Sequence, residues 1–429
     1  MMEMEKAIAD RKSAVWLAGE IASGRVRQDK VWDDFESALE KHEPTVKSLS
    51  FTENVEARRA RFTAADASGP LAGLPVGIKD VFDTYDLPTA YGSPIYEDHQ
   101  PASDAVSVAC IRAAGGVIAG KTVTTEFAYF TPGPTTNPHN QGHTPGGSSS
   151  GSAAAVAAGI VPFATGTQTG GSVIRPAAFC GVVGYKPTFD LIPTIGLKAF
   201  AWSLDTVGIF AQSVADAAFL TAAITGRDLM PSGEEGNPRV GYCETPMWPD
   251  AEPSMREAFP QMRERLVHAG FTVTDMVLPE IFEKAHEIHR VINDREGYFS
   301  LSHERLHHAD KLSSILIAAL ENGATYSAYQ YDEARQTLKQ ARLALTKLWR
   351  DVDILIAPSV TGEAPKGIGF TGNSAFNRLW TAMGVPCVNL PCGHGPNGLP
   401  LGVQVIGPAL GDKRTLAAAA ALADAVAGK

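Results

Sequence analysis

The spacing of apolar and polar positions changes along the chain, and each change predicts a different kind of element. Residues 8–67 carry mixed charges with apolar positions at helical spacing. In one stretch the apolar positions fall on a single face of an amphipathic helix: Val31, Phe35, Ala38 and Leu39. From 74 to 83 an almost continuous apolar run predicts a buried strand that leads into a loop.

Helix and strand patterns then alternate. A helix is predicted over residues 104–114, and short strands are predicted over 116–121 and 161–165. Glycine, proline, serine, threonine and asparagine dominate residues 132–151, which therefore predict a loop. This alternation of strands with helices favours an α/β fold.

A short helix is expected directly after that loop. Ser152 can cap a helix over residues 153–158 because a serine hydroxyl accepts from the first free N–H groups. Gly159 is the natural stop of this helix, since glycine ends helices in the left-handed conformation. The strand that follows then leads into a second glycine-rich turn.

The second half of the chain has a different pattern. Charge density rises between residues 226 and 350, where long helices are expected, as over 329–348. We interpret this region as a helical insertion packed on the sheet. Apolar runs at 353–358 and 398–407 predict two more buried strands, and an alanine-rich helix from Arg414 closes the chain.

Composition narrows the classes of partner. With 429 residues, 44% of them hydrophobic and 20% charged, the chain is an ordinary globular protein. A formal net charge of −10 argues against non-specific binding to nucleic acid or to an anionic membrane. The acidic start lacks the apolar stretch of a secretory signal, and the longest apolar stretch, 153–164, is too short to span a bilayer. Five cysteines without a Cys-x-x-Cys pair indicate reduced thiols, so we expect a cytoplasmic protein.

Two serines and a lysine supply the parts of an acyl-transfer site. Ser148 and Ser172 each follow a Gly-Gly pair directly, and Lys79 lies in the apolar run. One hydroxyl can act as the nucleophile, the second can relay a proton, and the lysine can be the final base. Local chemistry does not choose between Ser148 and its neighbours Ser149 and Ser150.

Each part has a physical argument and a plain structural alternative. Apolar neighbours would desolvate the ammonium of Lys79 and lower its pKa, so that a neutral amine can act as a base. Gly170 and Gly171 can adopt conformations barred to other residues, so successive N–H groups can converge on one oxyanion. The alternatives are a surface lysine, a flexible serine loop and a tight turn with a serine cap.

Four ordered motifs make the chain resemble the amidase signature family. They are Gly-Gly-Ser-Ser-Ser-Gly-Ser-Ala-Ala-Ala from residue 146, Gly-Thr-Gln-Thr-Gly-Gly-Ser from residue 166, and the segments 176–188 and 203–208. The match is dense from 74 to 210, returns at 353–358 and 398–408, and is thin over 226–350. The resemblance implies an α/β/α sandwich in which helices cover both faces of a large twisted mixed β-sheet.

The resemblance also implies a single amidase domain over residues 1–429. Its expected parts are an N-terminal helical segment, the signature catalytic core, a variable helical insertion and the C-terminal part of the core, over residues 1–68, 69–225, 226–350 and 351–429. The amphipathic N-terminal helices leave a homodimer open as an arrangement of two copies.

The family's catalytic residues map onto this chain one by one. The resemblance makes Ser172 the nucleophile, Ser148 the relay serine and Lys79 the base, and it requires no metal or organic cofactor. The expected oxyanion donors are four backbone N–H groups, those of Thr169, Gly170, Gly171 and Ser172. It further implies a cis peptide bond between Gly147 and Ser148, which is a strained arrangement typical of functional sites.

The chain departs from the commonest family pattern beside the nucleophile. Gln168 stands where many members have aspartate, and Arg175 lies three residues after the nucleophile rather than two. With the segments 137–147 and 376–384, these features are similar to the malonamidase branch, where residues matching Arg175 and Thr167 face a substrate carboxylate. We therefore predict Arg175, Thr167 and Gln168 as substrate-binding residues, because an arginine fork matches a carboxylate. The alternative is that Arg175 pairs with a buried acid.

Three other patterns suggest different chemistry and are weaker. His303 and His307 have the zinc-peptidase spacing His-Glu-x-x-His, but the extension with a glycine and a third histidine does not follow. Residues 147–151 fit Gly-x-Ser-x-Gly, but a proline-rich loop precedes them where that motif needs a strand. His139 and His143 flank the same loop, where packing is the simpler explanation.

The leading function is a hydrolase that cleaves a C–N amide bond of a small molecule through an acyl-enzyme. An ester or carbamate (urethane) hydrolase and an amidotransferase A-type subunit use the same chemistry and remain alternatives, and a non-catalytic binding protein is a third. The substrate is not identified by the sequence. Five aromatic residues are equally consistent with a pocket wall and with core packing: Phe127, Tyr129, Phe130, Trp202 and Trp380.

Overall fold

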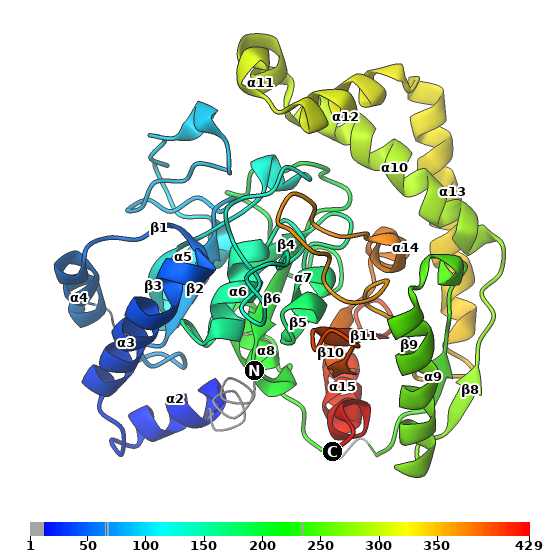
Figure 1. Cartoon of the computed structure of the whole chain (residues 1–429), viewed down its shortest axis with the longest axis horizontal. Helices are drawn as coiled ribbons and strands as arrows, with labels where there is room; N and C mark the ends of the chain where they lie inside the picture. Colours follow the sequence, from blue (N-terminus) through cyan, green and yellow to red (C-terminus); the bar gives the residue numbers. More distant parts are fainter. Residues whose placement is uncertain (1–12, 65, 67, 234–235) are drawn as a thin grey trace.

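The computed structural model describes residues 13–64, 66, 68–233 and 236–429, so the acidic start of the chain lies outside the described residues. In this part of the chain eleven strands form one mixed β-sheet (Figure 1). The strand order is β1-β3-β2-β4-β6-β5-β10-β11-β9-β7-β8. The protein therefore has the predicted α/β architecture, a large twisted mixed sheet with helices on both faces.

Parallel and antiparallel pairing occupy different parts of this sheet. The strands are β1 (Leu49–Phe51), β2 (Pro75–Lys79), β3 (Val117–Thr122), β4 (Phe163–Gln168), β5 (Val183–Lys186), β6 (Thr206–Ala211), β7 (Val240–Tyr242), β8 (Val273–Asp275), β9 (Ile354–Pro358), β10 (Cys387–His394) and β11 (Pro400–Ile406). Strand β2 pairs in parallel with β3 and β4, and β7 pairs in parallel with β8 and β9. The strands from β4 to β9 in the sheet order pair antiparallel. Strands β2 and β9 are buried along their whole length, which explains their continuous apolar pattern.

The helices form layers around the sheet. They are α2 (Ala14–Ala22), α3 (Gln28–Val46), α4 (Val55–Ala64), α5 (Val106–Ala113), α6 (Ser150–Ala158), α7 (Ile174–Phe179), α8 (Val214–Thr225), α9 (Pro253–His268), α10 (Ile281–Ser300), α11 (Ser302–His307), α12 (Ser314–Thr325), α13 (Ala328–Leu348), α14 (Ala375–Met383) and α15 (Asp412–Ala427). Helix α8 contacts α5 and α15, whereas α6 packs against β2 and β4 and also contacts α7. The helices α2 to α4 lie at the N-terminal, blue side in Figure 1.

Helical periodicity in the sequence predicts the long helices well. Helix α3 buries Val31, Phe35 and Leu39 as predicted, together with Trp32, while Ala38 is half-buried. Helix α13 spans Ala328–Leu348, one residue more than the predicted range 329–348. Both helices place one apolar stripe against the body of the protein, and such a stripe is the feature that the sequence pattern detects.

The predicted start of helix α6 is wrong. The helix begins at Ser150, and Ser152 lies inside it and not at its cap. The hydroxyl of Ser152 donates to the backbone oxygen of Thr165 at 2.7 Å and lies 2.6 Å from Thr122 Oγ1. It therefore ties the helix to the sheet, because buried hydroxyls take tertiary partners where these are available. Gly159 does end the helix in the left-handed conformation, with a φ of 74°.

Residues 226–350 contribute more than helices. They include α9 to α13, and α10 packs against both α12 and α13 at the upper right of Figure 1. The same region also supplies β7 and β8, which extend the sheet beyond β9. Part of this region is therefore continuous with the sheet and does not only lie on it.

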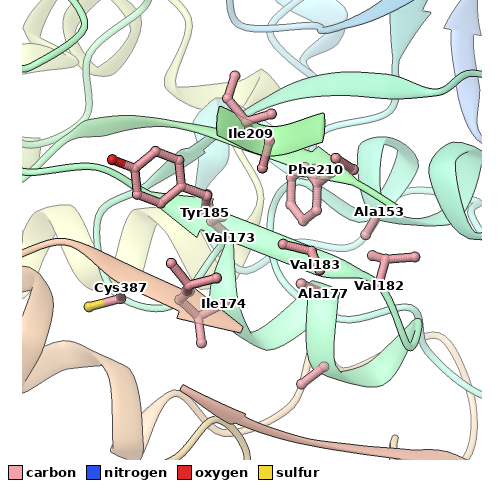
Figure 2. Packing of buried hydrophobic residues seen from close by; sticks show 14 of the residues in the cluster. Ala153, Val173, Ile174, Ala177, Val182, Val183, Tyr185, Ile209, Phe210 and Cys387 are labelled. Atoms are coloured by element: carbon pink, nitrogen blue, oxygen red, sulfur yellow. The ribbon is translucent and has the colours of Figure 1, made fainter. Parts of the chain in front are cut away.

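Buried apolar side chains pack α7 against the sheet (Figure 2). Figure 2 labels Ala153 of α6, Val173, Ile174 and Ala177 at α7, Val182, Val183 and Tyr185 at β5, Ile209 and Phe210 of β6, and Cys387 of β10. All of them are at most 5% exposed. Such close packing fixes the start of α7 and, with it, the glycine-rich turn that precedes the helix. None of the described helices combines the length and the apolar character needed to cross a membrane.

Candidate active site

Lys79 lies at the end of the buried strand β2, between β3 and β4. Its side chain is fully buried, and Nζ donates to Ser148 Oγ and to Thr167 Oγ1, both at 2.7 Å. Burial lowers the pKa of Lys79 to about 7, and the negative charge of Asp205 opposes part of that shift. A large fraction of Lys79 is therefore a neutral amine at neutral pH, which is the state that a general base requires.

The loop that carries Ser148 is pressed against α7. Gly147 has a φ of 65°, and a Cβ on it would come within 2.7 Å of the ring of Pro176, so only glycine fits there. Ser149 Oγ instead bonds the backbone of Thr167, and Ser150 Oγ has no partner among the described residues. Of the three neighbouring serines, only Ser148 contacts the lysine.

The expected cis peptide is not present. All the peptide bonds of the described residues are trans, including the bond between Gly147 and Ser148. The implication of a cis bond was therefore wrong for this structure. Left-handed glycines at 146 and 147, with φ values of 82° and 65°, turn the chain instead.

Residues 169–172 form a loop between β4 and α7, which we call the oxyanion loop. Its four residues, Thr169, Gly170, Gly171 and Ser172, line a cavity of about 250 Å³. In the described part of the chain, the N–H groups of Gly170, Gly171 and Ser172 donate to no other protein group. Ser172 is 8% exposed. The predicted nucleophile and oxyanion donors are thus together at one cavity wall.

The reason for glycine at 171 differs from the expectation. Neither glycine of this loop has a positive φ. A Cβ at Gly171 would meet Asn377 Oδ1 of α14 at 2.5 Å, so glycine is needed for the close approach of that helix. At Gly170 the nearest side-chain atoms are 3.8 Å away, which leaves this position open.

One link of the predicted proton relay is formed and one is not. Lys79 bonds Ser148, but no hydrogen bond joins Ser148 to Ser172 among the described residues. Catalytic hydrogen bonds are often long in enzymes without substrate and shorten in the complex.

Asp205 is a residue of this site that the sequence argument missed. It is buried and accepts hydrogen bonds from Thr169 Oγ1 and from the N–H groups of Phe200 and Ala201. Burial raises the pKa of Asp205 to about 6 although these donors favour the charged form. Its position in the 203–208 motif was visible in the sequence, but the partners that define its role lie elsewhere in the chain.

Thr167 and Gln168 do not line the cavity. Thr167 lies in strand β4, and its hydroxyl accepts a hydrogen bond from Lys79 Nζ. Gln168 Oε1 accepts from the N–H groups of Val173 and Ile174, and its Nε2 donates to Thr381 Oγ1. This placement does not match the predicted substrate-binding role, because both side chains form hydrogen bonds with other protein groups and not with the cavity.

Arg175 does reach the cavity. It is 2% exposed, Nη1 donates to the backbone oxygen of Gly372, and Nε is buried without a partner in the described part of the chain. No acidic side chain of the described residues forms an ion pair with it. Burial, followed by the charge of Arg378, lowers the pKa of Arg175 to about 9. The ring of Phe130 lies 5.8 Å from its guanidinium carbon.

Much of the remaining cavity wall comes from residues that the sequence argument did not single out. Helices α10 and α14, with the residue before α14, supply His289, Arg290, Asn293, Asp294, Ser374 and Arg378 to the cavity. Tyr129 and Phe130 line the cavity, which agrees with the pocket-wall interpretation of these two aromatic residues. The ring of Phe200 stacks on that of Tyr129, with 4.9 Å between the ring centroids. Of the other three aromatic candidates, Phe127 and Trp380 are buried in the core and Trp202 is 51% exposed.

The histidine patterns do not converge on the cavity. His303 and His307 are on α11, while Glu304 between them is buried and accepts from Lys198 and Tyr96. The described residues contain no group of three or more potential metal ligands. His139 bonds the backbone oxygen of Cys180, so it serves loop packing.

Fold and site together define an α/β hydrolytic enzyme with a buried lysine–serine pair next to a glycine-rich loop. The sequence model of the family described as Amidase matches residues 33–416. The chain therefore belongs to the amidase family, and it is a serine hydrolase that acts on carbon–nitrogen bonds.

Two kinds of relative, an amidotransferase subunit and hydrolases of amides, align with nearly the whole length of the chain. The A subunit of the glutamyl-tRNA(Gln) amidotransferase of Halothermothrix orenii is 31% identical, with 94% of each chain covered. The structure of a 6-aminohexanoate cyclic dimer hydrolase with its substrate has a TM-score of 0.86 at 25% identity and covers 97% of each chain. The peptide amidase of Stenotrophomonas maltophilia has a TM-score of 0.80 at 28% identity and covers 96% of each chain.

Proposed function

We propose that this protein hydrolyses a small amide through an acyl-enzyme on Ser172, with Ser148 as proton relay and Lys79 as base. The observation that carries the proposal is the buried bond of 2.7 Å between Lys79 Nζ and Ser148 Oγ beside the oxyanion loop. Its heavy-atom distance suits transfer of a proton in either direction. Neutral Lys79 accepts the proton of Ser148, which in turn accepts the proton of Ser172.

The same groups carry out the remaining steps of the reaction. Ser172 Oγ attacks the carbonyl carbon, and the N–H groups of the oxyanion loop stabilise the negative oxygen of the tetrahedral intermediate. Lys79 then returns its proton through Ser148 to the leaving nitrogen, and the C–N bond breaks. Water repeats the attack on the acyl-enzyme, which releases the acid and restores Ser172.

The substrate that we propose is a small amide with a carboxylate. The cavity of about 250 Å³ favours a small molecule, and Arg175 offers it a buried guanidinium without an acidic partner in the described chain. A carboxylate accepts paired hydrogen bonds from such a fork. This substrate class agrees with the malonamidase-like order of residues after the nucleophile.

The alternative with a specific observation in its favour is an amidotransferase A-type subunit. The relative from Halothermothrix orenii carries that name and matches over 94% of both chains. In that case the same site would release ammonia for a partner enzyme. Carbamate and ester hydrolysis share the acyl-serine step and are tested together with the amides.

We expect the purified chain alone to release ammonia from malonamate, and to do so faster than from propionamide. The assay compares malonamate, propionamide, a simple urethane and an ester, with Ser172→Ala as the blank. Activity of the isolated chain would support a stand-alone amidase. Ammonia release only after a partner protein is added would support the amidotransferase alternative, and turnover of the ester or urethane alone would change the substrate class.

Replacement of Arg175 by methionine is expected to raise KM for malonamate by about 10–100-fold, because a hydrogen bond to a charged group contributes about 1.5–3 kcal/mol. Methionine keeps a long unbranched side chain in the cavity wall but removes all donors. The control substrate is propionamide, which has no carboxylate, and its kcat/KM should stay within about threefold. An equal loss on both amides would mean that Arg175 supports the loop and not the substrate.

A further inference from the structure

Three of the four backbone oxygens of the oxyanion loop, those of residues 169–171, accept hydrogen bonds. Thr169 O accepts from His289 Nε2 of α10 at 2.7 Å, and Gly170 O accepts from Thr381 Oγ1 of α14 at 2.7 Å. Gly171 O accepts from the N–H group of Arg175 in α7 at 3.0 Å. Three consecutive carbonyl groups are therefore held by three different helices.

Peptide planarity converts these bonds into an orientation of the N–H groups. In a trans peptide the C=O of one residue and the N–H of the next lie in one plane and point in opposite directions. All described peptide bonds are trans. His289 therefore sets the direction of the Gly170 N–H, Thr381 sets that of the Gly171 N–H, and the first turn of α7 sets that of the Ser172 N–H.

The proton positions needed for both side-chain bonds are defined by the surroundings. A carbonyl oxygen can only accept, so His289 Nε2 carries a hydrogen. Burial, with a smaller effect of Arg378, lowers the pKa of His289 to about 3, so the ring stays neutral. Gln168 Nε2 donates to Thr381 Oγ1 at 2.9 Å, which leaves the threonine hydrogen for Gly170 O at 2.7 Å or for Asn377 O at the longer distance of 3.2 Å.

We propose that His289 and Thr381 are positioning residues of the oxyanion loop, which hold two of its N–H groups toward the developing oxyanion. This inference rests on the proposed function of Ser172. It assigns a task to α10, in the region where the sequence motifs of the family are thin, and a task to Gln168 as the residue that orients Thr381. An aspartate at position 168 would have no N–H to donate to that hydroxyl.

The test measures how fast a fluorophosphonate phosphonylates Ser172, since the reaction needs the oxyanion loop but no known substrate. The matched pair is His289→Gln and His289→Asn. Glutamine can place an amide N–H near the position of Nε2, whereas asparagine is one methylene too short to reach Thr169 O. We expect the maximal inactivation rate of His289→Asn to fall about 10–100-fold at unchanged half-saturation, and that of His289→Gln to stay within about threefold.

Thr381→Val and Thr381→Ser form an independent pair. Valine has nearly the shape of threonine without the hydroxyl, and serine restores the hydroxyl, so only Thr381→Val should lose about 10–100-fold in the maximal rate. Mass spectrometry locates the adduct, and thermal unfolding confirms that each variant is folded. An adduct that forms at the wild-type rate in both His289→Asn and Thr381→Val would overturn the inference alone. Absence of a Ser172 adduct on the wild-type protein would overturn the proposed function and the inference with it.

Discussion

Substitution of Ser172 by alanine is expected to lower kcat for amide hydrolysis at least ~10⁴-fold and to abolish the covalent adduct with a fluorophosphonate. The physical reason is that the acyl-enzyme route needs an oxygen nucleophile at the cavity wall. The oxyanion loop contains two hydroxyls in the described structure, and that of Thr169 donates to Asp205, so Ser172 supplies the hydroxyl that remains at the cavity wall. The residual rate would come from binding and from the N–H groups alone.

Two neighbouring serines provide the controls for this experiment. Ser148→Ala should also be severely impaired, because the relay to Lys79 is broken, yet the protein retains the nucleophile and can still form an adduct slowly. Ser150→Ala should react at nearly the wild-type rate, since Ser150 Oγ has no partner in the described chain. An adduct that persists on Ser172→Ala, mapped to another residue, would show that the nucleophile is assigned wrongly.

Replacement of Lys79 by methionine is expected to lower the acylation rate about 10²–10⁴-fold, the range typical of a positioned general base. Methionine fills the buried space with an unbranched, neutral side chain, so that the loss reports the missing proton acceptor. Single-turnover kinetics with an excess of enzyme measure acylation directly. Thr167→Val is the matched control, because it removes the second bond of Lys79 Nζ but leaves the base in place. Its rate should fall less than about tenfold.

The pH dependence of the wild-type protein follows from the same lysine. The reactive form is the neutral amine, and the pKa of Lys79 is lowered to about 7. The acylation rate should therefore rise about tenfold per pH unit below pH 7 and level off above it. Asp205, whose pKa is raised to about 6, ionises in the same window and opposes deprotonation of Lys79. In Lys79→Met the inflection near pH 7 should disappear, and its persistence would assign the titration to another group.

The elements with a strong periodic pattern could be predicted from the sequence. The amphipathic stripe of α3 and the fully apolar run of β2 both depend on residues close together in the chain. The start of α6 could not be predicted in this way. Ser152 has the chemistry of a cap, but the backbone oxygen of Thr165 competes for its hydroxyl, and that oxygen reaches it only in the folded protein.

The candidate site likewise has parts that could be predicted from the sequence and parts that could not. Glycine-rich motifs indicated Ser172 and the oxyanion loop, which line one cavity. His289 and Thr381 carried no local signal, because each donates a hydrogen bond to one backbone oxygen of a loop more than a hundred positions away. For Gln168 the residue type was noticed, but its role was not, since its partner Thr381 lies 213 positions further along the chain.

The sequence by itself determined which chemical groups this protein possesses, namely two serines behind glycine pairs and a lysine in an apolar strand. Tertiary structure alone decided the state and the orientation of those groups. The pKa of Lys79 falls to about 7 because other strands remove the water around its ammonium, and desolvation depends on everything packed around a charge and not only on its neighbours in the chain. The carbonyl oxygens of Thr169 and Gly170 in the oxyanion loop are held by His289 and Thr381 of distant helices, so residues far along the chain orient the N–H groups in the same peptide units.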